Sequence, residues 1–385
     1  MCLVAIHNIK SNNYEVININ SILSSSYLNF VTLCMGNQFP FNQISCHTIS
    51  LLWGEKCLGL QSYLHLSMWS FNHTASNSPA FSFIGIPGLE AAQIWISIPF
   101  CLLYFLALVG NALLLILVKA EQNLHEPQFY FLAVLALTDL GLSLSTMPSV
   151  LAIFWFNVHY IGLDACLTQM FFIHALSSVE SGVLVAMAFD RLVAVCAPLN
   201  YTRLLTHSTV ACLGGAAVIR SAALVAPLSF LLRTFPFCGA NILSHSYCYL
   251  PDMLNLACGD ATFSGVYGFV FVLFTFAVDV VFILASYMKI LATVTKLENQ
   301  DRNWKSLHTC ACHLCTVFVF YLPLISLAVL HRYTQNTSPM LFTSMSNAYL
   351  LMTPLLNPLV YSLKSRQIQA ALRKRFWVKR VIAGE

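Results

Sequence analysis

The chain has 385 residues, of which 58% are hydrophobic and only 9% are charged. Ordinary soluble domains carry about 25% charged residues, so this composition excludes a soluble globular fold and favours helices that face lipid or one another. The formal net charge is +4, and no basic run interleaved with aromatic residues occurs outside the tail, which argues against nucleic acid as a partner. We therefore expect an all-α membrane protein whose partners are membrane lipids and other proteins.

Residues 1–67 are rich in Asn and Ser and lack both a long apolar run and the basic start of a signal peptide. A start at Met68 would give a short N-terminus with a glycosylation sequon at Asn72. We predict an atypical extension over 1–67, which is either disordered or not translated. An extracellular N-terminus over 68–94 follows, with a glycan on Asn72.

Seven apolar stretches of about 20 residues come next, the length that crosses the hydrocarbon core of a bilayer as a helix. They lie near residues 95–118, 129–152, 166–190, 209–232, 264–290, 307–330 and 341–362. The sequence therefore predicts a seven-transmembrane helix bundle over residues 95–363.

Residues 364–385 predict a short amphipathic C-terminal helix. Ile368, Leu372 and Phe376 recur four residues apart with basic residues between them, which is typical of a helix that lies on the membrane surface. The alternative is a solvated basic tail.

The basic residues predict the orientation. Fourteen of the nineteen Lys and Arg residues follow spans one, three and seven or separate spans five and six, whereas only Arg233 and Arg332 lie in loops on the other side. Because cytoplasmic loops carry the excess of Lys and Arg, we predict a cytoplasmic C-terminus and an extracellular N-terminus.

Four cysteines fall on the predicted extracellular side. They are Cys166 at the outer end of span three, and Cys238, Cys248 and Cys258 in the loop between spans four and five. In the oxidising exterior we expect two disulfides, one fastening the loop to span three and one within the loop. The spacing alone does not give the pairing, and no metal site or cofactor is predicted.

Charged residues inside a membrane are costly and mark functional or paired positions. Four polar residues near mid-depth predict a core that holds a cation or protons, with a neutral or paired interior as the alternative. They are Asp139, Glu180, Asn111 and Asn357. We interpret Arg220 and Asp279, which also lie inside spans, as structural.

The cytoplasmic end of span three reads Met-Ala-Phe-Asp-Arg-Leu-Val-Ala-Val-Cys over 187–196, with Pro-Leu-Asn-Tyr at 198–201. It resembles the odorant receptor family of G protein-coupled receptors, whose usual string is Met-Ala-Tyr-Asp-Arg-Tyr-Val-Ala-Ile-Cys. Further family strings follow in the right order, so that the resemblance covers about residues 68–377. They stand at residues 110–111, 124–127, 305–314, 320–323 and 354–363. Residues 85–90, Gly-Ile-Pro-Gly-Leu-Glu, and 95–101 resemble the class I, or fish-like, branch.

The sequence departs from the family pattern at several positions near the cytoplasmic side. Gln128-Phe129 stands where the family usually has Met-Tyr, and Leu192 replaces an aromatic residue. His308 and Cys312 replace serines. These departures bear on how readily the receptor activates and leave the fold unaffected.

The resemblance implies a plasma-membrane receptor that binds a small volatile or water-soluble organic molecule and activates a heterotrimeric stimulatory G protein to raise cyclic AMP. It implies that Asp190 holds Arg191 at rest and that Tyr361 supports the active state. With the family in view, we expect the disulfide pairs Cys166–Cys248 and Cys238–Cys258.

The implied ligand pocket lies in the outer half between spans three, five and six, although ordinary helix packing is the alternative at each position. The candidates are His174, Ser177, Ser178, Phe274, Val278, Tyr321, Ser326 and Arg332. Arg332 suits either an anionic group of a ligand or an anchor at the lipid headgroups.

Other functions fit less well. A retinal pump needs a Lys within span seven, but Lys364 lies past its end. A transporter usually shows repeated halves, and this sequence shows none. An enzyme needs a nucleophile with a base, paired carboxylates or a motif such as HExxH, and the sequence shows no such pattern. A related receptor that does not couple to a G protein stays open as an alternative.

Overall fold

The computed structural model describes residues 80–84, 93–156, 159–237, 241–243, 245–258, 262–296, 300–333 and 339–382. Within these ranges, the side chains of residues 93–94, 156, 262, 300–309, 312, 328–333, 339–344, 364 and 376–382 are not described. The extension over 1–67, the sequon at Asn72, Cys238 and the side chain of Arg332 therefore lie outside the described part. The chain divides into two compact units, and the fold below is that of the second, Ala80–Glu385.

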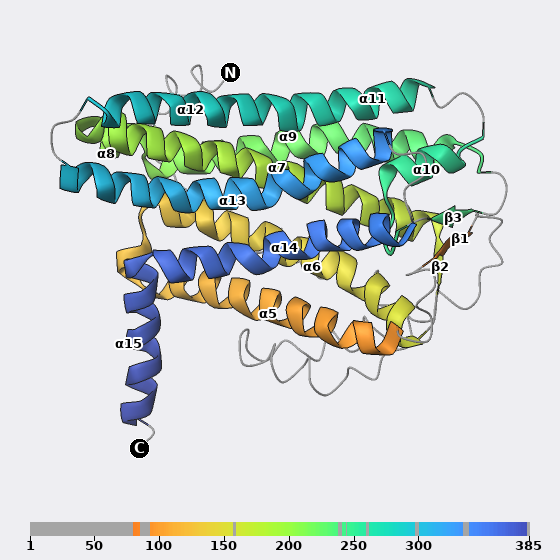
Figure 1. Ribbon diagram of the computed structural model, residues 1–385, viewed down its shortest axis with the longest axis horizontal. Coiled ribbons are helices and arrows are strands. Elements are labelled where there is room, and N and C mark those ends of the chain that lie inside the picture. Colours follow the sequence, from red (N-terminus) through yellow and green to blue (C-terminus); the bar gives the residue numbers. More distant parts are fainter. Residues whose placement is uncertain are drawn as a thin grey trace, which may run out of the picture. The chain divides into compact units, whose positions relative to one another are not determined.

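Seven long helical segments of this unit run side by side along its length (Figure 1). They are α5 (Gln93–Ala120), α6 (Pro127–Phe156), α7 (Leu163–Cys196), α9 (His207–Thr234), α11 (Thr262–Val272) continued by η4 (Leu273–Ala277) and α12 (Val278–Val294), α13 (Gln300–Tyr333) and α14 (Pro339–Lys364). Helix α7 is central, because it packs against α6, α9, α12 and α13. Each predicted span falls within one of these segments, and the predicted seven-helix bundle is confirmed.

By length and apolarity alone, four helical segments of the described part qualify as membrane spans: α5, α6, α9 and α11–α12. Helix α7 qualifies together with the bent turn that follows it, and α13 contains a shorter apolar stretch, His313–Leu327. The helices run a few residues past the predicted spans at both ends, because the apolar criterion measures only the hydrocarbon core while a helix continues through the headgroup region.

A small sheet closes one end of the bundle (Figure 1). Strand β1 (Ala80–Phe83) pairs antiparallel with β2 (Tyr160–Gly162) and parallel with β3 (Ile242–Leu243). Phe81 is fully buried and meets Phe237 edge to face, with ring centroids 5.0 Å apart. The sheet thus ties the segment before α5 to two interhelical loops, an arrangement absent from the sequence prediction.

A disulfide joins Cys166, in the first turn of α7, to Cys248, just before α10 (Leu250–Leu256), with Cα atoms 5.4 Å apart. Gln169 supports this link, since its Oε1 accepts a hydrogen bond from the Cys248 backbone N–H at 3.0 Å. The expected Cys166–Cys248 pair is therefore present. Cys258 is also disulfide-bonded, and Cys238, its expected partner, lies outside the described residues. We call this end of the bundle the disulfide end.

The opposite end carries η2 (Gln122–Leu124), η3 (Pro198–Asn200), α8 (Tyr201–Leu204) and α15 (Arg366–Ile382), which turns away from the bundle axis (Figure 1). Ile368 and Ala371 of α15 are buried against apolar residues of α5 and α6. Lys374 of α15 binds Glu121 at 2.8 Å. The predicted amphipathic C-terminal helix is confirmed, with its apolar side anchored to the bundle. We call this end the Arg191 end.

Candidate functional site

Arg191 lies in the last turns of α7, where two neighbours hold its guanidinium group. Its Nη2 lies 3.1 Å from Oδ2 of the buried Asp190 and donates to Oε1 of Gln128, in the first turn of α6, at 2.5 Å. Tyr201 of α8 donates its hydroxyl to the other Asp190 oxygen at 2.8 Å. Burial and the Asp190 charge raise the pKa of Tyr201, so its phenol stays protonated and remains a donor. The predicted pair Asp190–Arg191 is thus present. Gln128 binds its arginine and Tyr201 binds its aspartate, and neither contact was predicted from the sequence.

Tyr361, the third residue predicted for the switch, lies near the Arg191 end of α14. Its hydroxyl approaches the Met187 sulfur at 3.9 Å, a weak contact. The structure thus places Tyr361 against α7 about one turn from Arg191.

The predicted polar core is assembled from α6, α7 and α14. Nδ2 of Asn357 donates to Asp139 at 3.0 Å and to Glu180 at 3.2 Å, and both carboxyl groups are completely buried. Asn111 lies nearby and donates instead to the backbone oxygens of Ala107 and Pro354. Within the described part of the chain, Oε2 of Glu180 and the amide oxygens of Asn111 and Asn357 have no hydrogen-bond partner. The core therefore contains two carboxyl groups and oxygen atoms with unused acceptor capacity.

A second buried network links α9, α12, α7 and α13. Arg220 binds Asp279 through two hydrogen bonds of 2.7 Å each. Ser181 donates to the same carboxylate at 2.6 Å, so Tyr321 is the donor in its 2.7 Å contact with Ser181. Gly182 permits this close packing, since a Cβ there would lie 2.9 Å from Ala217 Cβ and 3.2 Å from Nη2 of Arg220. The predicted ligand contact Tyr321 is thus already joined to the pair Arg220–Asp279.

His174 faces the interior at the disulfide end of α7. Its ring lies 6.1 Å from that of Tyr249, in the loop before α10, and 6.3 Å from that of Phe271 on α11. Its Nε2 is buried and has no hydrogen-bond partner among the residues that the structure describes. Three residues farther along α7, Ser177 accepts a hydrogen bond from Tyr349 of α14 at 3.2 Å. The Nε2 atom of His174 therefore lies in a region bordered by the aromatic rings of Tyr249, Phe271 and Tyr349, which we call the enclosure.

Four of the predicted ligand positions do not face this enclosure. Ser178 turns toward α9, where it accepts a 2.8 Å hydrogen bond from Ser221, because residues 177 and 178 point about 100° apart around a helix. Ser326 donates to the Leu322 backbone at 2.8 Å. Phe274 and Val278 lie on the outside of the bundle, 60% and 38% exposed, so their predicted place in the pocket is wrong.

The π-helical turn η4 accounts for the error at Val278, which directly follows it, whereas Phe274 lies inside the turn. Such a turn inserts an extra residue into the helical repeat and rotates everything that follows. Phe271, Thr275 and Phe276 are the buried residues of this region, and the Thr275 hydroxyl has no hydrogen-bond partner among the described residues. A uniform 3.6-residue period across residues 264–290 cannot show this shift.

Sequence reasoning also missed Tyr249 and Tyr349, which border the enclosure together with His174 and Ser177. Burial and the nearby Asp252 raise the pKa of Tyr249 to about 12, so its phenol is neutral at physiological pH. The available signal was its position one residue after Cys248, because the disulfide draws that segment over α7.

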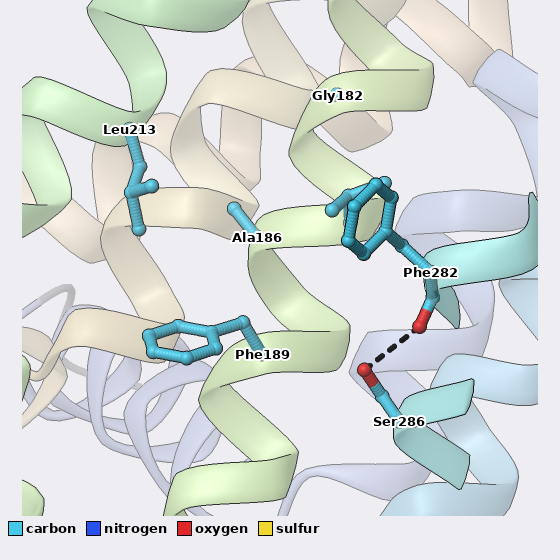
Figure 2. Close-up of a pocket in the computed structure, with 7 residues that line it drawn as sticks. Gly182, Ala186, Phe189, Leu213, Phe282 and Ser286 are labelled. Carbon is cyan, nitrogen blue, oxygen red and sulfur yellow. Dashed lines mark hydrogen bonds between the residues drawn. The ribbon is translucent and has the colours of Figure 1, made fainter. Parts of the chain in front are cut away.

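A groove of about 280 Å³ lies elsewhere, between α7, α9 and α12 (Figure 2). Its walls include Phe189 and Phe282, both exposed on the outside of the bundle, and its polar Ser286 hydroxyl already donates to the Phe282 backbone at 2.8 Å. The groove therefore opens toward the surrounding lipid and contains none of the predicted ligand residues.

Comparisons with known proteins agree with this geometry. The sequence profile described as "Olfactory receptor" matches residues 100–379. Human olfactory receptor 51G2 is 45% identical over 79% of this chain and 97% of its own length, and human olfactory receptor 52K2 is 44% identical over 79% and 97%. Such relatives fit the class I branch. Squid rhodopsin, at 16% identity, shares the fold with a TM-score of 0.62 over 75% of this chain and 87% of its own.

The helical bundle, the Asp190–Arg191 pair and these relatives lead to one assignment. The chain is a multi-pass plasma-membrane protein and not an enzyme. It belongs to the olfactory receptor family of G protein-coupled receptors.

Proposed function

We propose that this receptor binds a small volatile or water-soluble organic molecule between the disulfide-end halves of α7, α11, α13 and α14. The observation that carries the proposal is the buried Nε2 of His174, which has no partner among the described residues. A buried polar atom without a hydrogen bond is costly, and a ligand hydroxyl, carbonyl or carboxyl group would satisfy it. Aromatic neighbours such as Tyr249 and Phe271 suit the apolar remainder of such a molecule.

We further propose that the disulfide end is extracellular and the Arg191 end cytoplasmic. The distribution of Lys and Arg, which gather toward the Arg191 end, supports this orientation. The disulfide Cys166–Cys248 at the other end supports it too, since disulfides persist in oxidising compartments. On the cytoplasmic side, release of Arg191 and an outward movement of α13 would open a groove for a stimulatory G protein, which raises cyclic AMP. Pro323 within α13 supplies a bending point.

Substitution of His174 tests the ligand site. We expect His174→Phe to raise the half-maximal odorant concentration about tenfold, because one hydrogen bond to the ligand is lost while the aromatic packing is kept. The measurement is cyclic AMP in cells that receive a panel of short aliphatic acids, alcohols and aldehydes. Phe274→Leu, on the outer surface of the same region, is the matched control. Equal potency of wild type and His174→Phe for every active odorant would remove His174 from the site.

We also propose that the polar core of Asp139, Glu180 and Asn357 holds a monovalent cation such as Na⁺ when no odorant is bound. Two buried carboxyl groups share the single Asn357 amide as donor, so neutralising them requires a cation or protons. We expect Na⁺, compared with an equal concentration of choline, to raise the melting temperature of the purified receptor by a few degrees, as a ligand of the folded state does. Asp139→Asn should abolish this difference. A melting temperature that depends on pH and not on Na⁺ would favour protons.

A further inference from the structure

Gln128 connects Arg191 to a helix other than its own. The nitrogen Nη2 of Arg191 that lies 3.1 Å from Asp190 also donates to Oε1 of Gln128 at 2.5 Å. Asp190 adjoins Arg191 on α7, whereas Gln128 lies in the first turn of α6. The contact with Gln128 therefore fixes the guanidinium group relative to a second helix, which Asp190 alone cannot do.

The amide of Gln128 is itself oriented. Its Nε2 donates to Oε2 of Glu126 at 2.7 Å, so its carbonyl oxygen is the atom left to face Arg191. A carboxylate that accepts from the amide N–H also polarises the amide and strengthens its oxygen as an acceptor. The other oxygen of Glu126 lies 3.5 Å from Nε2 of Gln367 on α15. A chain of polar contacts thus runs from α15 through Glu126 and Gln128 to Arg191.

We infer that Gln128 is a positioning residue that holds Arg191 against α6 and lowers the basal signalling of this receptor. The family pattern has Met at this position, and a thioether is only a weak acceptor that cannot replace the amide oxygen. Loss of the contact leaves Arg191 with Asp190 alone and shifts the equilibrium toward the conformation in which Arg191 is released. The inference rests on the proposed coupling to a G protein.

The test compares basal signalling at equal surface expression, without odorant, for four variants. Gln128→Met should raise basal signalling about tenfold, the change in equilibrium expected from losing one hydrogen bond to a charged group. Gln122→Met alters an exposed glutamine at the same end of the bundle and should match the wild type. The double variant Glu126→Gln, Gln128→Glu keeps a carboxylate acceptor for Arg191 and an amide donor beside it. Its basal signalling should therefore return toward the wild-type level. Asp190→Asn, which removes the other partner of Arg191, is the positive control.

Two readouts separate this inference from the proposed coupling. One is activation of each class of Gα subunit in cells, and the other is hydrogen–deuterium exchange over residues 300–312 of α13 in the purified receptor, which needs no G protein. Faster exchange in Gln128→Met and Asp190→Asn, with no Gα response in any variant, would support the role of Gln128 in holding Arg191 and contradict the coupling. Wild-type exchange and signalling in Gln128→Met, while Asp190→Asn is active, would overturn the inference. Unchanged hydrogen–deuterium exchange in every variant would also overturn the inference. So would basal signalling in the Glu126→Gln, Gln128→Glu double variant as high as in Gln128→Met, because altered packing and not the lost hydrogen bond would then be responsible.

Discussion

Asp279→Ala is expected to remove most of the receptor from the cell surface. The substitution leaves the Arg220 guanidinium group within the bundle without the carboxylate that binds it through two 2.7 Å hydrogen bonds. Breaking a buried ion pair by removing one partner costs about 3–5 kcal/mol, a large part of the stability of an ordinary domain. Arg220 is 32% exposed, but inside a membrane that surface faces lipid and gains no hydration. Flow cytometry of an N-terminal epitope measures the loss.

Two further variants show whether the uncompensated charge causes this loss. Asp164→Ala breaks the exposed pair Asp164–Arg233, whose side chains are 66% and 63% exposed, and should change stability by no more than about 1 kcal/mol. Arg220→Met combined with Asp279→Leu removes both charges and should recover much of the surface expression. Wild-type expression and melting temperature in Asp279→Ala would show that the pair contributes little.

Arg191→Ala is expected to abolish the odorant-evoked cyclic AMP response while surface expression stays near that of the wild type. Arg191 lies near the end of α7, and the buried Asp190 that its removal leaves behind keeps the hydrogen bond from Tyr201, which limits the loss of stability. The loss should appear in the maximal response, because the proposed role of Arg191 lies in engaging the G protein and not in binding odorant. The measurement is a concentration–response curve for an active odorant at matched receptor density.

Arg203→Ala is the matched control for this experiment. Arg203 lies on the exposed face of α8, within one short loop of Arg191, so its loss removes a positive charge from the same region without touching Asp190. We expect its response to equal that of the wild type. An equal loss in both variants would mean that general charge matters more than the specific position of Arg191, and an unchanged response in Arg191→Ala would refute the assigned switch.

The sequence was sufficient to predict the bundle because each crossing needs its own apolar run, which is a local property. The same holds for the short helix α15, whose apolar spacing predicted the buried Ile368. The small sheet could not be predicted, since β1 has four residues and β3 has two, too few for a strand pattern to stand out. Its pairing also depends on loops that lie far apart in the sequence.

Predictions about the site succeeded where the chemistry of the side chains is enough to select the residues. They failed where the position of a residue depends on which side of its helix faces the bundle interior. Asp139, Glu180 and Asn357 were grouped correctly because charged groups in a membrane must meet a partner. Val278 was misplaced because η4 rotates the helix between it and the disulfide end, and Phe274 lies within that turn. Gln128 was visible as a departure from the family pattern, but only the structure shows that it reaches Arg191.

The pair Arg220–Asp279 also sets an order on the synthesis of the receptor. The two residues are 59 positions apart in the chain, so α9 is complete before α12 emerges from the ribosome. At about 5–20 residues per second, Arg220 waits several seconds for its partner. During that time the helix must stay beside the insertion machinery, or its guanidinium group would face lipid unpaired. Slower translation of the loop between these helices would lengthen the wait and lower the yield of mature receptor.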